Sequence, residues 1–333
     1  MPPIVLEPYS RPQVWGGTRL QSRYGKTAPP NTLVGESWEV SGHALHTSRV
    51  AEGPLAGMSL NELWQTHRHT WCPDPELVRH ERFPWLIKLL DCQEPSSLQV
   101  HPDDRQAARL RPGESGKTEA WYVLEADATS RLYTGLKSGV TDAELRRRLR
   151  DGTVLDVLHS VTPKAGEAYL IPAGLVHAIG AGLVLFEIEQ CSDLTWRLFD
   201  WNRVDAAGKP RELHIEAALE CLDWSLPPAV AAKPDICASQ AAILEERLLA
   251  CRWFVMDRIT LTTDAWPIPA SGLTAWFVVE GAGQLENSAE TGSLEFQRGQ
   301  TILVPPNDQP QRWLRNSCDK LQLLRCTWPG SVP

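Results

Sequence analysis

Two histidines in this sequence have neighbours typical of a metal site. His101 directly follows the strand-like segment 97–100, and His177 follows the turn-forming residues 172–174. Glu119 lies between them in the sequence and precedes apolar strand-forming residues. Two imidazoles and a carboxylate on separate strands suit a divalent cation such as zinc, manganese or iron, and they leave coordination positions for a substrate oxygen. We therefore expect a catalytic metal centre at His101, Glu119 and His177.

Two further polar residues are spaced to face the same centre. Gln99 lies two residues before His101, and Lys117 lies two residues before Glu119. Because side chains two apart on a strand point to the same face, each pair shares a side of its strand. The same rule places Glu187 and Glu189 on one face of a later apolar strand.

The elements that must hold these residues are mostly short strands. Apolar or alternating runs recur between turn residues, at 37–40, 85–90, 120–124, 167–171 and 182–188. Such spacing is typical of a β-sandwich or jelly roll. Capping boxes at Ser59 and Thr141 predict short helices, the first within an insertion near residues 55–80, and apolar spacing predicts a third over 212–222.

A second strand-rich block follows an Ala/Pro-rich linker that begins near Pro227. Segments 276–283 and 296–306 resemble a weaker copy of the earlier strands, and no histidine follows His214. We expect an internal duplication with two cupin-type jelly-roll domains. Residues 1–226 would form the metal-binding catalytic domain, and residues 227–333 a metal-free cupin-like domain.

Composition restricts the partners. The 333-residue chain has 42% hydrophobic residues, a net charge of −8 and eight cysteines. The negative charge argues against nucleic acid and anionic membranes. No apolar run approaches the roughly 20 residues of a membrane helix, and the first residues lack a secretory pattern. We expect a cytoplasmic protein with free thiols, and its oligomeric state stays open.

Several segments together resemble one known family, the type I mannose-6-phosphate isomerases of the cupin superfamily. The resemblance covers about residues 10–205 and follows the order of the family's motifs, which here are 15–17, 35–40, 99–104, 116–122, 172–179 and 187–203. The length is similar to that of a shorter bacterial branch. The resemblance implies a metal-dependent enzyme that interconverts mannose 6-phosphate and fructose 6-phosphate through an enediol.

The resemblance also implies roles for single residues. The metal, usually zinc, would be held by His101, Glu119 and His177, with Gln99 as a fourth ligand. Arg197 resembles the family's active-site arginine, and Glu187 matches a carboxylate assigned to proton transfer.

Two more residues complete the expected catalytic set. Lys117 is the best candidate for phosphate binding or ring opening, because it shares a strand face with Glu119. Asp193 is expected to orient Arg197. A small-molecule sugar phosphate is then the expected partner.

Three alternatives remain open on the sequence. A related cupin isomerase could act on another sugar or sugar phosphate, since no Gly-rich phosphate cradle is present. A non-catalytic sugar-sensing cupin would not need both Arg197 and Glu187. A metal-dependent oxygenase leaves the 187–203 motif unexplained.

Overall fold

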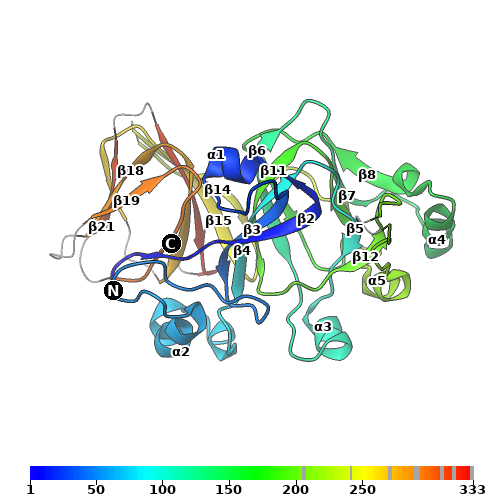
Figure 1. Cartoon of the computed structure of the whole chain (residues 1–333), viewed down its shortest axis with the longest axis horizontal. Helices are drawn as coiled ribbons and strands as arrows, with labels where there is room; N and C mark the ends of the chain where they lie inside the picture. Colours follow the sequence, from blue (N-terminus) through cyan, green and yellow to red (C-terminus); the bar gives the residue numbers. More distant parts are fainter. Residues whose placement is uncertain are drawn as a thin grey trace.

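The computed structural model describes residues 1–204, 208–240, 242–268, 272–287, 293–307, 311–316 and 320–330. It contains two β-sandwiches side by side, with the N-terminal residues mainly in one and the C-terminal residues in the other (Figure 1). The expected mainly-β fold with two cupin-type jelly-roll sandwiches and a small helical insertion is confirmed. All strand pairs between named strands are antiparallel in the described part of the chain.

The N-terminal sandwich has two facing sheets. The larger sheet has the order β2 (Tyr9–Gly17), β3 (Val34–Ser41), β4 (Trp85–Cys92), β11 (Leu183–Gln190), β6 (Glu119–Ala126), β9 (Ala168–Ile171). The smaller sheet has the order β12 (Trp196–Phe199), β5 (Leu98–Val100), β10 (His177–Ile179), β7 (Leu132–Leu136), β8 (Leu158–Val161).

The C-terminal sandwich repeats this arrangement. Its larger sheet has the order β1 (Ile4–Val5), β20 (Thr301–Val304), β17 (Thr274–Glu280), β22 (Leu321–Thr327), β15 (Val255–Leu261), β14 (Ile243–Ala250), β13 (Asp235–Gln240). Its smaller sheet has the order β16 (Ala265–Pro267), β21 (Gln311–Arg315), β18 (Ala282–Asn287), β19 (Ser293–Gln297). The order β14-β15-β22-β17-β20 therefore corresponds to β3-β4-β11-β6-β9.

The correspondence extends to one row of charged residues. In the first sandwich, Glu187 of β11 pairs with Lys88 of β4 and Trp121 of β6. In the second, Arg325 of β22 pairs with Asp257 of β15 and Trp276 of β17. The tryptophan is retained, whereas the two charges have exchanged strands. Both charged pairs are almost fully buried.

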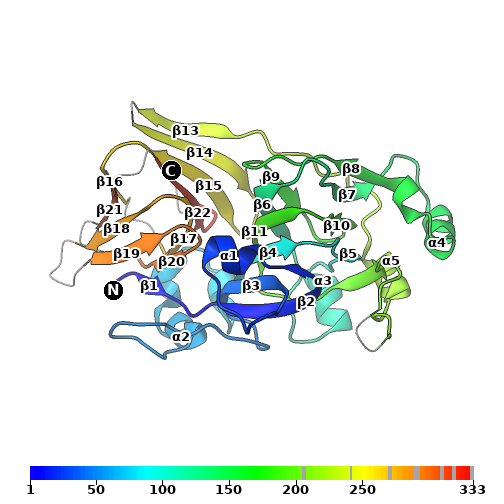
Figure 2. The ribbon, with the colours of Figure 1, turned by 45° about the horizontal axis from the view of Figure 1, so that its top comes forward.

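The two sandwiches share one apolar core. The outer face of β4, β6 and β11 packs against β15, β17 and β22, and Phe186 contacts Phe277 with ring centroids 5.2 Å apart. Trp85 stacks on Trp328 at 3.7 Å. Strand β1, from the N-terminus, pairs with β20 of the second sandwich. The hairpin β13–β14 lies along the top of Figure 2 and reaches toward the first sandwich.

Short helices lie around the sheets: α1 (Arg19–Tyr24), α2 (Leu60–Trp71), α3 (Asp104–Leu110), α4 (Asp142–Arg150), α5 (Ile215–Cys221) and the 3-10 turns η1 (Leu77–Arg79) and η2 (Val154–Val157). The capping box of α2 at Ser59 is confirmed, and the Thr141 side chain caps α4. The third predicted helix is shorter than expected, since it begins at Ile215 rather than Glu212. His214 occupies the N-cap position, and the backbone N–H of His214 donates to the carbonyl oxygen of Arg197.

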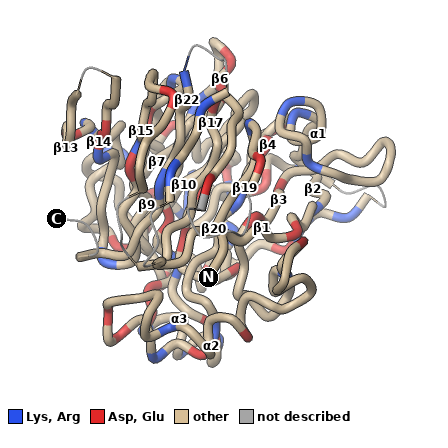
Figure 3. The backbone as a smooth tube through the Cα atoms, turned by 90° about the vertical axis from the view of Figure 1, so that its left-hand side faces the viewer, with Lys and Arg blue, Asp and Glu red and all other residues tan. Residues whose placement is uncertain are grey.

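Charged residues of both signs lie on the surface. Acidic and basic residues are interspersed over the strands seen in Figure 3, and the arginines of α4 pair with neighbouring acids. Seven cysteines are free thiols, and Cys318 lies outside the described residues. Among the residues described, no helix combines the length and apolar character of a membrane crossing.

Candidate active site and metal centre

Three predicted metal ligands converge inside the first sandwich. Glu119 is the first residue of β6, His177 is the first residue of β10, and His101 directly follows β5. One ligand atom from each lies within 4.8 Å of the other two. All three side chains are about 1% exposed. The strand ends therefore bring together residues that are up to 76 positions apart in the sequence.

Backbone contacts orient both imidazoles toward Glu119. The Nδ1 of His101 donates to the carbonyl of Leu194 at 2.7 Å, and that of His177 donates to the carbonyl of Leu175 at 2.9 Å. This leaves each Nε2 as a lone-pair donor to a cation, at 3.2 and 3.3 Å from the Glu119 oxygens. Metal-binding histidines characteristically use their second nitrogen in this way. The residues present thus fit a divalent metal ion.

The charges of the three residues agree with this reading. Burial, followed by the nearby Lys117, lowers the pKa of His101 to about 3, and burial also lowers the pKa of His177. Burial alone would raise the pKa of Glu119, but Lys117 and the two imidazoles hold it well below its usual value. Two neutral imidazoles and an ionised carboxylate are the forms that bind metal.

Gln99 lies beside this group. Its Nε2 is 3.3 Å from His177 Nε2, and its Oε1 accepts a hydrogen bond from Ser97 at 3.0 Å. In the smaller sheet, Gln99 pairs with His177 on one side and with Arg197 on the other. This row connects the metal-ligating group directly to the predicted active-site arginine.

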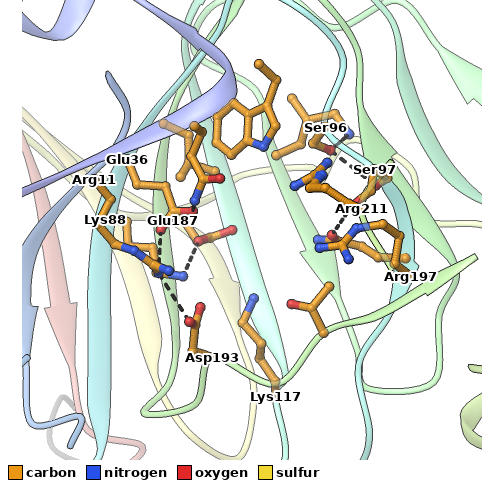
Figure 4. Close-up of a pocket in the computed structure, with 16 residues that line it drawn as sticks. Arg11, Glu36, Lys88, Ser96, Ser97, Lys117, Glu187, Asp193, Arg197 and Arg211 are labelled. Carbon is orange, nitrogen blue, oxygen red and sulfur yellow. Dashed lines mark hydrogen bonds and ion pairs between the residues drawn. The ribbon is translucent and has the colours of Figure 1, made fainter. Parts of the chain in front are cut away.

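A pocket of about 390 Å³ opens next to the metal-ligating group. It is lined by polar residues of the first sandwich, with a few apolar ones: Arg11, Gln13, Trp15, Glu36, Lys88, Leu90, Ser96, Ser97, Gln99, Lys117, Ile179, Glu187, Asp193, Thr195, Arg197 and Arg211. Figure 4 shows Glu187, Lys88 and Arg11 at one end and Arg197 and Arg211 at the other, with Lys117 between them.

Glu187 lies at the end of the pocket that also contains Glu36 and Asp193, which we call the acidic end. Its Oε1 accepts a hydrogen bond from Trp121 Nε1 at 2.9 Å, and its Oε2 is 3.5 Å from Lys88 Nζ. Only 3% of Glu187 is exposed. A nearly dry carboxylate with one fixed oxygen and a nearby ammonium group is suited to accept a proton from a bound substrate.

Lys117 and Lys88 are joined by a second carboxylate, that of Glu189. Lys117 Nζ lies 2.7 Å from Glu119 and 2.8 Å from Glu189, while Lys88 Nζ lies 2.7 Å from Glu189. Burial would lower the pKa of each lysine, but the surrounding carboxylates raise both above the usual value. Both ammonium groups are therefore charged.

The opposite end of the pocket is basic. Arg211 makes two hydrogen bonds to Asp200, at 2.6 and 2.7 Å, and Arg203 contacts the same carboxylate. Arg197 Nη1 donates to the carbonyl of Glu212 at 2.8 Å. Burial and the neighbouring Arg211 lower the pKa of Arg197. Arg203 and Arg211 share the Asp200 carboxylate and Arg197 contributes a third guanidinium group nearby, so this end has excess positive charge.

One expected contact is wrong. Asp193 does not orient Arg197: its carboxylate lies 3.2 Å from Arg11 Nη1, which also contacts Glu36 at 3.2 Å. Asp193 follows β11 and lies at the acidic end, whereas Arg197 lies at the basic end. Every lining residue lies before residue 212, so the described part of the C-terminal sandwich contributes none of the lining.

Three cationic residues of the pocket were missed from the sequence. Lys88 carried a signal, because it is the single cation in the otherwise apolar run 85–90. Arg11 and Arg211 carried none, because their positions depend on partners at Asp193 and Asp200. Trp15 lines the pocket, while Trp38 is fully buried and donates to Glu36 at 2.7 Å.

Comparison with known proteins agrees with this geometry. The family model for the catalytic domain of type I phosphomannose isomerases matches residues 4–125. The mannose-6-phosphate isomerase ManA of Bacillus subtilis is 32% identical over 304 residues, which are 91% of this chain and 93% of that protein. The mannose-6-phosphate isomerase of Streptococcus mutans is 36% identical over 225 residues, covering 66% and 68% of the two chains.

Similarity in three dimensions extends over the full chain. A crystal structure of the mannose 6-phosphate isomerase from Bacillus subtilis superimposes with a TM-score of 0.88 at 29% identity, covering 98% of this chain and 99% of that one. Both sandwiches and their order are thus common to the two proteins. This chain belongs to the type I phosphomannose isomerase family.

Proposed function

We propose that this protein interconverts mannose 6-phosphate and fructose 6-phosphate through an enediol. The observation that carries the proposal is one pocket with three kinds of group: a metal-ligating set, a buried carboxylate with two lysines, and a pair of arginines. Isomerisation of an aldose 6-phosphate can use each of these groups, because the reaction moves a proton between C2 and C1, develops negative charge on an oxygen, and keeps a phosphate anchored.

His101, Glu119 and His177 would hold the metal, with Gln99 beside them, and zinc is the ion we propose. The bound ion would supply positive charge to an oxygen of the substrate without any proton transfer. The remaining chemistry belongs to the side chains of this chain.

Glu187 is the proposed base. It takes the proton from C2 of the open-chain aldose, the C2–H electron pair forms the C1–C2 double bond, and the carbonyl π pair moves to O1 to give the enediolate. O1 then gains a proton and the O2 hydroxyl loses one. As the C2=O bond forms, the electron pair of the C1–C2 double bond takes the proton from Glu187 at C1, which gives the ketose. Trp121 and Lys88 hold the carboxylate in place. The position of Lys117 beside Glu119, away from the two arginines, favours ring opening and oxygen contact over phosphate binding.

Arg197 and Arg211 are proposed to divide the basic end between them. Arg197 is aligned with Gln99 and His177 across the sheet, so it lies next to the metal-ligating group and would donate to substrate oxygens near the reacting carbons. Arg211 comes from outside the sheet and, with Ser96 and Ser97, would bind the phosphate. Guanidinium groups match phosphate geometry well.

We also propose a division of labour between residues 1–226 and 227–333. The first part would carry metal and chemistry, and the second would support the fold without a metal. Thr274, which lies two residues before Trp276 as Glu119 lies two before Trp121, supports this because a threonine replaces the carboxylate. Strand β1 crosses the boundary to pair with β20, so the two parts are interlocked.

The experiment is a coupled assay of the purified, zinc-loaded protein with mannose 6-phosphate, glucose 6-phosphate and free mannose. We expect turnover of mannose 6-phosphate well above that of the other two. Preference for a different sugar phosphate would favour the related cupin isomerase. Binding of the sugar phosphate without turnover would favour a sensor.

A further inference from the structure

Glu189 holds a position that the proposed mechanism does not use. Its side chain is 0% exposed and does not line the pocket, whereas Lys88 and Lys117 in front of it do. Each of its oxygens contacts a different lysine: Oε1 lies 2.7 Å from Lys88 Nζ, and Oε2 lies 2.8 Å from Lys117 Nζ. One carboxylate thus fixes two ammonium groups relative to each other.

The strand register explains why Glu189 reaches both lysines. On β11, Glu189 pairs with Glu119 of β6 and with Leu86 of β4. Lys88 lies diagonally across β4, since it pairs with Glu187, and Lys117 directly precedes Thr118 and β6. Glu189 is therefore between the strand that carries one lysine and the segment that carries the other.

The neighbouring carboxylates are already engaged. Glu187 accepts from Trp121 and is 3.5 Å from Lys88, a longer contact than that of Glu189. Glu119 belongs to the metal-ligating set. Without Glu189, Lys117 would keep its 2.7 Å contact with Glu119, and Lys88 would keep only the 3.5 Å contact with Glu187. Because long lysine side chains have high rotamer entropy, the two ammonium groups would then no longer be held relative to each other.

We propose that Glu189 is a positioning residue that sets the places of the Lys88 and Lys117 ammonium groups against the substrate. The proposal rests on the proposed function for its kinetic consequence. Its structural content, that one buried carboxylate restrains two pocket lysines, is independent of the substrate.

The test compares Glu189→Ala, Glu189→Gln and the control Ile188→Val in the full-length, metal-loaded protein. Ile188 is buried on the opposite face of the same strand, in the core shared by the two sandwiches. Three quantities are measured: bound metal, kcat and KM with mannose 6-phosphate, and the rate of reductive methylation at Lys88 and Lys117 by mass spectrometry.

We expect Glu189→Ala to keep its metal, to lose about tenfold or more in kcat with a smaller change in KM, and to methylate faster at both lysines, because misplaced catalytic groups are costly. Glu189→Gln keeps one acceptor oxygen and should lose less. Ile188→Val should match the wild type in its kinetic constants and in the methylation rates of the two lysines.

Unchanged methylation at both lysines in the alanine variant would overturn the proposal, as would an unchanged kcat in a wild type that is active. If the alanine variant does not fold, the glutamine variant decides by the same two readouts. A wild type that cannot isomerise mannose 6-phosphate would refute the proposed function, while the methylation rates would still decide the role of Glu189.

Discussion

The indole of Trp121 and the carboxylate of Glu187 face each other across the β6–β11 ladder, joined by a 2.9 Å hydrogen bond. Because both side chains are buried, this bond fixes one oxygen of the proposed base and leaves the other directed to Lys88 and the pocket. A neutral donor can orient a carboxylate without adding a formal charge.

Loss of this carboxylate should stop the proton transfer while leaving the metal site intact. Glu187→Gln is expected to lower kcat by about 10²-fold or more, in the range of general-base removal. Trp121→Phe should lower kcat less, since the carboxylate remains. Metal analysis and steady-state kinetics test both variants. A glutamine variant with wild-type kcat would show that another group is the base.

Removal of one imidazole should release the metal. His101→Ala or His177→Ala takes away one of three or four ligands, so bound metal and activity are expected to fall together. A chelator should inactivate the wild type, and added divalent metal should restore it. Elemental analysis is the measurement, and full metal occupancy in both variants would contradict the assigned ligands.

The two arginines should separate in their kinetic effects. Arg197→Ala is expected to lower kcat by about 10²-fold, as loss of a charge-stabilising donor does. Arg211→Ala is expected to raise KM for mannose 6-phosphate by roughly 10- to 100-fold, the effect of losing a charged hydrogen bond. Arg146→Ala, on the exposed face of α4, is the control. A rise in KM alone for Arg197→Ala would make it a ground-state binding residue.

Removal of the second sandwich should destabilise the first. A fragment of residues 1–226 would expose the outer face of β4, β6 and β11 and would leave Trp85 without Trp328. A large exposed apolar surface favours aggregation. We expect insoluble or unstable protein on expression. A soluble fragment with near-normal isomerase activity would show that the second sandwich is a separate module.

Replacing Arg325 should lower the free energy of unfolding without changing kcat. Arg325→Met removes the 2.7 Å partner of the buried Asp257, which keeps its 2.9 Å contact with Arg247. We therefore expect a loss of about 1–3 kcal/mol in the free energy of unfolding, below the cost of leaving a buried charge with no partner. Denaturant unfolding should show this loss, while kcat of the folded fraction is unchanged. The double variant Asp257→Leu/Arg325→Met should recover part of the stability. If the single variant were as stable as the wild type, the pair would not be a structural contact.

Alternation along strands explains part of the predicted metal-ligating group. Period two accounts for the shared face of Gln99 and His101 on one strand, whereas the grouping of His101, Glu119 and His177 from separate strands was implied by the family resemblance. Helix α3 was missed although Asp103 and Gln106 form a capping box, because the helix is only seven residues long. Arg211 could not be predicted, since its place is set by Asp200, eleven residues away across a loop.

The exchanged charges of the two sandwiches have a consequence for the history of the chain. A single substitution that restored glutamate at position 325 would bury it against Asp257, and restoring lysine at position 257 would bury it against Arg325. Either intermediate places like charges side by side in a dry interior, where repulsion is strong. A direct exchange of the charges therefore passes through a buried pair of like charges, which is a barrier to regaining the acid–base row of the first sandwich. This barrier favours keeping the acid–base chemistry in the first sandwich once the two halves have diverged.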